Sequence, residues 1–91
     1  MKFDFEVGEV AKRRIEFEFN QLFGRTVILI DGKEAKRNVR WFSEPLVETH
    51  DLQISDLEQV SVKIEKRRNQ LLGAQYLVYV NNHLTQKHVG I

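Results

Sequence analysis

The chain has 91 residues, no cysteine, and a formal net charge of +1 from 14 lysines and arginines against 13 aspartates and glutamates. This length fits one domain with a single core, and the lack of cysteine excludes disulfides and thiolate chemistry. The near-zero net charge gives little long-range attraction for nucleic acid or anionic lipid, so any basic function has to come from a local patch.

The first ten residues, MKFDFEVGEV, alternate apolar and charged side chains, which predicts a strand with Phe3, Phe5 and Val7 on one face. This alternation leaves no continuous apolar core, so we expect no signal peptide. No stretch approaches the roughly 20 apolar residues that a membrane helix needs. We therefore expect a cytoplasmic protein with no membrane partner.

The same two-residue period recurs in RRIEFEF and in VSVKIEK. It puts Ile15, Phe17 and Phe19 on one face of the first segment, and Val60, Val62 and Ile64 on one face of the second. β-branched and aromatic residues fill both segments, as a half-buried pleated surface prefers. Both segments are predicted to be strands.

Asp31-Gly32 lies between two strand-like runs in TVILIDGKEAKRNVRWF, which predicts a hairpin with a two-residue type I′ turn. Such a loop pairs Ile30 with Lys33, Ile28 with Ala35, and Thr26 with Arg37. One face then carries Ile28, Ile30, Ala35, Val39 and Trp41. The other face carries Val27, Leu29, Glu34, Lys36, Asn38 and Arg40. The charges mark this second face as the solvated one, so Val27 and Leu29 should point outward, partly covered by the stems of Lys36 and Glu34.

Two parts of the chain repeat each other. RIEFEFNQLFG aligns with KIEKRRNQLLG, and TVILIDGKEAKRNV aligns with YLVYVNNHLTQKHV, where Asn81-Asn82 replaces Asp31-Gly32. We interpret this as an internal strand-loop-hairpin repeat with units at about 13–42 and 60–91. Carried over to the second unit, the faces put Val78, Val80 and Val89 inside and Leu77, Tyr79 and Leu84 outside.

The middle of the chain is less regular. Pro45 marks a turn, a strand follows with an imperfect apolar pattern, and SDLE at 55–58 has the form of a capping box that opens one helical turn. The strand pattern consists of Leu46, His50, Leu52 and Ile54. About eight strands without a long helix predict an all-β fold, an antiparallel β-sandwich of two roughly four-stranded sheets, as a single domain over residues 1–91.

The first unit resembles the Fas apoptotic inhibitory molecule family. The matching residues are IEFE at 15–18, Gly24-Arg25, DGKE at 31–34, Arg37 and WF at 41–42. Downstream, VSVKIEKRRNQLLGAQYLVYVNNHLTQKH has the spacing of the second half of that family's amino-terminal domain. The second turn is Asn-Asn, where the family tends to have an Asn-Gly type.

The resemblance implies an all-β sandwich, no enzymatic activity and no cofactor. In animals the family is associated with restraint of death-receptor apoptosis and with protection against protein aggregation under stress. These are expectations from the family, and no binding residue is carried over from it.

Candidate catalytic and metal-binding residues are few. Glu16 and Glu18 project from the same face of a strand, and glycosidases use two carboxylates that lie close together in this way. A solvated strand face explains the two glutamates better. His50 has Glu48 and Asp51 nearby, yet Asp51 points to the opposite face of a strand. His83 and His88 also face opposite ways on a regular strand. No nucleophile elbow or phosphate loop occurs, so we expect no enzyme, no metal and no cofactor.

Three clusters of basic residues allow an alternative function, the binding of single-stranded nucleic acid. They are Lys12-Arg13-Arg14, Lys36-Arg37 with Arg40, and Lys66-Arg67-Arg68. With Trp41, Tyr76 and Tyr79 near in sequence, they resemble the combination of charge and stacking that binds single-stranded nucleic acid. Glutamates interleave the same strands and would cancel this field, so we rank nucleic-acid binding second.

A more specific feature than the basic clusters is a set of apolar residues that are predicted to face outward: Val27, Leu29, Leu77, Tyr79 and Leu84. A contiguous patch of this kind marks a protein contact or a self-association surface, unless long side chains or the termini cover it. The face assignment depends on the two-residue turns, and a bulge would reverse it. The sequence therefore predicts a non-enzymatic protein-interaction module that binds a protein partner or a second copy through a sheet face. The alternative is a small β-domain that binds single-stranded nucleic acid.

Overall fold

The computed structural model describes residues 1–20, 24–39, 47–55, 58–68 and 73–90. Within these ranges the chain forms eight β-strands and no helix. It divides into two compact units, Met1–Glu44 and Pro45–Ile91, and each unit holds one four-stranded antiparallel sheet. The predicted all-β class with two four-stranded antiparallel sheets is confirmed. The boundary of a single domain over residues 1–91 stays a prediction.

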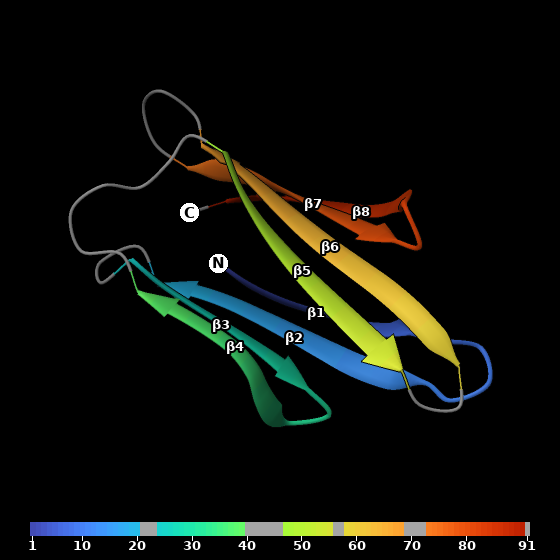
Figure 1. Ribbon diagram of the computed structural model, residues 1–91. Coiled ribbons are helices and arrows are strands. Elements are labelled where there is room, and N and C mark those ends of the chain that lie inside the picture. The colour runs from blue at the N-terminus through green and yellow to red at the C-terminus, as the bar shows by residue number, and fades with distance from the viewer. Residues whose placement is uncertain (21–23, 40–46, 56–57, 69–72, 91) are drawn as a thin grey trace. The chain divides into compact units, whose positions relative to one another are not determined.

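The first sheet has the order β1-β2-β3-β4, drawn from blue to green in Figure 1. Its strands are β1 (Lys2–Val7), β2 (Arg13–Asn20), β3 (Arg25–Ile30) and β4 (Lys33–Val39). One face, called inner here, is buried and carries Phe3, Phe5, Val7, Ile15, Phe17, Phe19, Thr26 and Ile28. The predicted apolar faces of β1 and β2 are therefore confirmed.

The second sheet has the order β5-β6-β7-β8, drawn from yellow-green to red in Figure 1. Its strands are β5 (Val47–Ser55), β6 (Gln59–Arg68), β7 (Ala74–Val80) and β8 (His83–Gly90). The apolar side chains buried on its inner face are Leu52, Ile54, Val60, Val62, Ile64, Ala74, Tyr76 and Val78. The predicted face of the VSVKIEK strand is confirmed. The predictions for Trp41, Leu46 and the two central residues of the capping box at 55–58 lie outside the described residues.

Both hairpins close with the predicted two-residue turn. Ile30 pairs with Lys33 around Asp31-Gly32, and Val80 pairs with His83 around Asn81-Asn82. The four central residues have positive φ, at 51° and 80° in the first turn and 49° and 67° in the second. Positive φ at both central positions is what a type I′ turn requires, and Asn, Asp and Gly tolerate it best.

The pairing beyond the first turn differs from the prediction. Leu29 faces Glu34, but Ile28 then faces Lys36, so Ala35 is an extra residue that forms a β-bulge. The predicted pairs of Ile28 with Ala35 and of Thr26 with Arg37 are wrong, because the bulge shifts the rest of β4 by one residue. Ala35 is exposed, and Lys36 lies on the inner side, opposite buried Ile28.

The second hairpin contains the same bulge. Tyr79 faces Leu84, and Val78 then faces Gln86, which leaves Thr85 as the extra residue. The prediction that Val89 is inside is therefore wrong, because Val89 pairs with Gln75 on the outer face and is 65% exposed. Val78 is fully buried as predicted, and Val80 is half-buried.

The two sheets correspond residue by residue, but not in the register of the repeated sequence motif. In the first sheet, Ile15 pairs with Ile30. In the second sheet, Val80 occupies the position of Ile30, and it pairs with Val62. The alignment on Asn-Gln-Leu-x-Gly instead puts Ile15 over Ile64, which is a shift of two residues. The identities of the alignment at Ile15 and Glu16 therefore do not fall on matched strand positions. The internal repeat itself stays a prediction.

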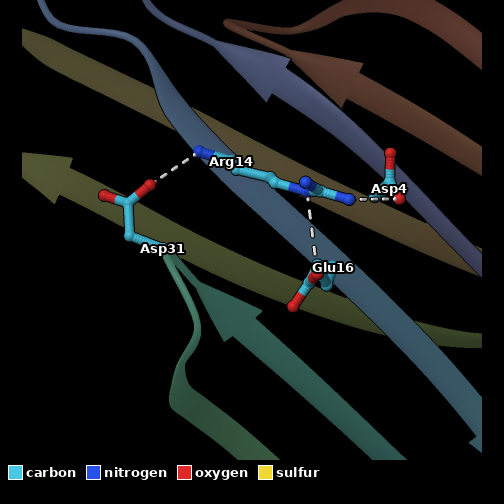
Figure 2. A network of polar contacts seen from close by, with 4 residues as sticks. All are labelled: Asp4, Arg14, Glu16 and Asp31. Carbon is cyan, nitrogen blue, oxygen red and sulfur yellow. Dashed lines mark hydrogen bonds and ion pairs between the residues drawn. The ribbon is translucent and has the colours of Figure 1, made fainter.

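A polar network ties the first turn to β2 (Figure 2). The Arg14 backbone N–H donates to Asp31 Oδ1 at 2.9 Å, and the Asp31 N–H donates to the Arg14 carbonyl at 2.8 Å. The Arg14 guanidinium lies 2.9 Å from Asp4 and 3.6 Å from Glu16. The hydrogen bond from the Arg14 backbone, together with one from Arg13, lowers the pKa of the Asp31 carboxyl group. This network fixes the position of the turn relative to β2.

The second turn has the same anchor without a charge. The Asn81 side-chain oxygen accepts a hydrogen bond from the Ser61 backbone N–H at 3.0 Å, and the Asn81 N–H donates to the Ser61 carbonyl at 2.8 Å. An amide oxygen can therefore replace the carboxylate at this position. This comparison isolates what the charge of Asp31 adds, which is an acid-sensitive part of the stability.

Replacing Asp31 with asparagine should reduce the loss of stability in acid. Because the folded-state pKa of Asp31 is lowered, its charge stabilises the fold above the unfolded-state pKa, and this contribution disappears as the pH falls through the folded-state pKa. Urea unfolding from about pH 7 to about pH 2 should show D31N below the wild type at neutral pH, with the gap closing below about pH 4. A gap of constant size across this range would contradict the assigned role.

The stability should also respond in opposite directions when alanine replaces the glycine of the first turn and when glycine replaces the equivalent asparagine of the second turn. In G32A the added methyl group meets no atom within 4 Å, so the cost comes from the positive φ of +80° alone. We expect a loss of about 1–2 kcal/mol in the free energy of unfolding. N82G, at the equivalent position with φ 67°, should instead raise stability by less than about 1 kcal/mol. Urea midpoints measure both, and a neutral G32A would show that the turn adopts another conformation.

Candidate protein-binding face

The outer face of the second sheet carries apolar side chains in adjacent strands. On β7, Leu77 and Tyr79 point outward and are half-buried, on either side of buried Val78. Leu84 on β8 lies directly opposite Tyr79 and is 57% exposed, and Val89 further along β8 is 65% exposed. We call Leu77, Tyr79, Leu84 and Val89 the second-sheet outer patch. It extends from the interior strand β7 to the edge strand β8.

Basic side chains border this patch. Lys63 on β6 pairs with Tyr79, and its ammonium group lies 5.1 Å from the centre of the tyrosine ring. Such a cation–π contact favours a fixed position for both side chains. On β8, exposed Lys87 lies between Leu84 and Val89 on the same face and pairs with Leu77. The tyrosine ring and Leu77 therefore each have a lysine on a neighbouring strand.

Acidic side chains on this face are matched by basic ones. Glu65 pairs with Leu77 from the β6 side and accepts a hydrogen bond from Arg67 at 3.1 Å. Asp51 of β5 lies opposite Lys63. The outer face of the second sheet thus combines an apolar centre with a charged border, which is the usual anatomy of a protein interface.

The first sheet has the same geometry with different side chains. Val27 and Leu29 occupy the positions of Leu77 and Tyr79, and both are half-buried. Leu29, however, lies between Glu16 on one side and Glu34 on the other. Where the second sheet has exposed Leu84, the first therefore has a carboxylate, and the apolar pair of Tyr79 with Leu84 has no counterpart at this position of the first sheet.

Glu34 is also engaged in its own ion pair. The Arg37 guanidinium donates two hydrogen bonds to its carboxylate, at 2.9 and 3.1 Å. These bonds lower the pKa of Glu34 and raise that of Arg37. This ion pair forms a polar border next to Val27, because Arg37 lies opposite Val27 across the strands.

The structure thus gathers only part of the predicted binding set. Leu77, Tyr79 and Leu84 come together on the second sheet, whereas Val27 and Leu29 belong to the first unit. The sequence interpretation missed Val89, because the bulge at Thr85 was not foreseen. That these residues bind a protein stays a prediction.

Four arginines of the basic clusters are paired with acids. Arg13 lies 2.9 Å from Asp31, and the neighbouring Arg14 contacts Asp4. In the other two clusters, Arg37 and Arg67 contact Glu34 and Glu65, and Lys66 is buried with 3% exposure. These contacts reduce the positive charge open to phosphates. Nucleic-acid binding stays a prediction as well.

The histidine and carboxylate candidates do not gather into one three-residue site, although His50 lies beside Glu48. His50 is buried, whereas Asp51 is exposed on the outer face. The bulge puts His83 and His88 on the same face, contrary to the expectation for a regular strand, but they pair with Val80 and Tyr76, about 13 Å apart along β7. The described residues contain no group of three His, Cys, Asp or Glu side chains that could hold a metal. Glu16 and Glu18 share the outer face of β2, and Glu16 contacts Arg14 at 3.6 Å.

A buried polar row on the second sheet was not predicted. Glu48, Lys66 and Tyr76 lie opposite one another across β5, β6 and β7 on the inner face. His50, two residues along β5, has Nε2 at 3.2 Å from Glu48 Oε1. The equivalent residues of the first sheet are Met1, Phe3, Phe19 and Thr26. The sequence did indicate that Lys66 faces inward, because it continues the two-residue series of Val60, Val62 and Ile64.

In the part of the chain that the structure describes, no helix is long and apolar enough to cross a membrane.

Comparisons with known proteins agree with the sequence resemblance. The family model described as Fas apoptotic inhibitory molecule (FAIM1) matches residues 7–90. A search of curated proteins found no match. Because the family model spans nearly the whole chain, including β2 to β8 and both hairpins, the chain belongs to the Fas apoptotic inhibitory molecule family.

Proposed function

We propose that the chain is a non-enzymatic, cytoplasmic protein-interaction module that binds through the second-sheet outer patch. The observation that carries this proposal is the cross-strand pair of Tyr79 and Leu84, which continues the apolar surface of β7 onto the edge strand. In the first sheet the equivalent pair is Leu29 with Glu34. The same scaffold therefore presents a solvated border on one sheet and an apolar contact surface on the other.

The chemistry of the patch fits burial against a partner. Leu84 and Val89 are more than half exposed, so covering them would remove apolar area from water at about 25 cal/mol per Å². The tyrosine adds a rigid, amphipathic side chain of the kind that is enriched at interfaces. Lys63 and Lys87 would remain at the rim, where charges mainly set specificity and association rate.

Replacing Leu84 with glutamate should weaken partner binding, because it gives the second sheet the side chain that the first sheet has at this position. A photo-reactive benzoylphenylalanine at Val89, in an extract of the cells that express the protein, reports the contact by its cross-linking yield. We expect L84E to lower that yield about tenfold, since burying one leucine contributes roughly 1.5–3 kcal/mol.

V10E is the matched control. Val10 is 73% exposed and lies outside the strands, so the same change of an apolar residue to an acid should leave the yield unchanged. Circular dichroism and urea unfolding verify that both variants fold. Equal yields for L84E and V10E, or no specific cross-link from position 89, would contradict the proposal. A cross-linked species of twice the chain mass would identify a second copy as the partner.

A further inference from the structure

We propose that the edge of β8 takes up an extended acidic peptide segment as an added antiparallel strand. This inference rests on the proposed function and specifies its partner. β8 pairs with β7 on one side, and no described strand pairs with its other side (Figure 1). Addition of a strand to such an edge is a common mode of peptide recognition, in which main-chain hydrogen bonds supply affinity and alternate side chains supply specificity.

The charge of β8 distinguishes it from the other edge strands. Residues 83–90, HLTQKHVG, contain one lysine and two histidines and no carboxylate. The other three edge strands all carry acids: Asp4 and Glu6 in β1, Glu34 in β4, and Glu48 and Asp51 in β5. β4 has a positive excess as well, because Lys33, Lys36 and Arg37 accompany Glu34, so the distinguishing feature of β8 is its lack of carboxylates. Directly opposed charges of unlike sign stabilise a strand pair and like charges destabilise it. The β8 edge, whose one formal charge is that of Lys87 and which has no carboxylate to repel an acid, therefore favours an acidic strand.

The side chains of β8 set the pattern of the partner. After the bulge, Lys87 and Val89 follow Leu84 on the outer face, and Gln86 and His88 lie on the inner side, where the His88 ring lies 2.9 Å from the Gln86 side-chain oxygen. An added strand would place an acid beside Lys87 and apolar residues beside Leu84 and Val89. Because Leu84, Lys87 and Val89 share one face, the partner residues beside them would also lie on one face of the added strand. A strand that strictly alternates valine and glutamate places its acids together on one face, and it meets the requirement at Lys87 only.

The bulge also limits where the new strand pairs. The Thr85 hydroxyl group donates to the Val78 carbonyl at 3.2 Å, so the extra residue is held towards β7. A bulge disrupts the ladder locally, and proteins use bulges to protect edges from unwanted pairing. The regular part of the edge is residues 86–90. In a symmetric antiparallel pair of two β8 strands centred on residue 87, the two Lys87 side chains would lie opposite each other, which disfavours self-association in that register.

Three capped, fluorescent eight-residue peptides test this inference by anisotropy: one that alternates valine and glutamate, one that alternates valine and lysine, and the first peptide with alternate peptide nitrogens methylated on the side that would face β8. The wild-type protein should bind the glutamate peptide about fivefold or more tightly than the lysine peptide. The K87E variant should reverse this preference. Methylation should abolish binding, because it removes the main-chain donors.

K33E is the matched control, since Lys33 is an exposed lysine on β4, the edge strand of the other sheet. It should leave the preference unchanged. Amide hydrogen exchange should also slow at alternate residues within 86–90 when the glutamate peptide is present. Equal binding of the two charged peptides, binding that survives methylation, or a reversal by K33E would overturn the inference.

The outcomes separate this inference from the proposed function. Cross-linking at position 89 that depends on Leu84, together with no peptide preference, would retain the patch and overturn strand addition. An increase in sedimenting mass without peptide would identify a second copy as the occupant and overturn the acidic-peptide assignment. Binding of a thymidine oligonucleotide in place of the glutamate peptide would overturn it in favour of nucleic acid.

Discussion

The arrangement of each hairpin depends on a tight turn that is followed by a single-residue bulge. Because side chains alternate between faces along a strand, one extra residue moves every later residue of that strand to the opposite face. Ala35 and Thr85 are these extra residues. In the second hairpin the bulge turns Lys87 and Val89 outward, so that they continue the surface that Leu84 begins. Without the bulge, the apolar surface of β8 would stop after one residue.

The two sheets show how one scaffold supports two different surfaces. Their strand order, turn geometry and bulge position agree, yet the outer pair is Leu29 with Glu34 in one sheet and Tyr79 with Leu84 in the other. The inner faces differ as well, since Phe19 in the first sheet corresponds to buried Lys66 in the second. The backbone frame is shared, and the differences that bear on binding come from a few side chains.

Much of the arrangement of strands and turns could be predicted, because the amino-acid sequence shows directly the two-residue apolar period and the residues that tolerate positive φ. The faces of β1, β2 and β6 and the closing pairs of both turns follow from these signals. The bulges were not predictable in this way, since alanine and threonine are ordinary strand residues and nothing in the composition marks them as extra. The burial of Lys66 was missed because lysine is read as a surface residue, although its position in the alternation pointed inward.

The most direct measurement is the cross-strand pairing of β7 with β8 by NMR, from nuclear Overhauser contacts between backbone hydrogens. The account predicts that Val78 is opposite Gln86 and that Gln75 is opposite Val89, with Thr85 as the extra residue. Contacts between Val78 and Thr85 would instead show a regular hairpin. In that case Val89 would point inward and Lys87 would leave the outer face, and both the extended patch and the basic peptide-binding edge would be contradicted.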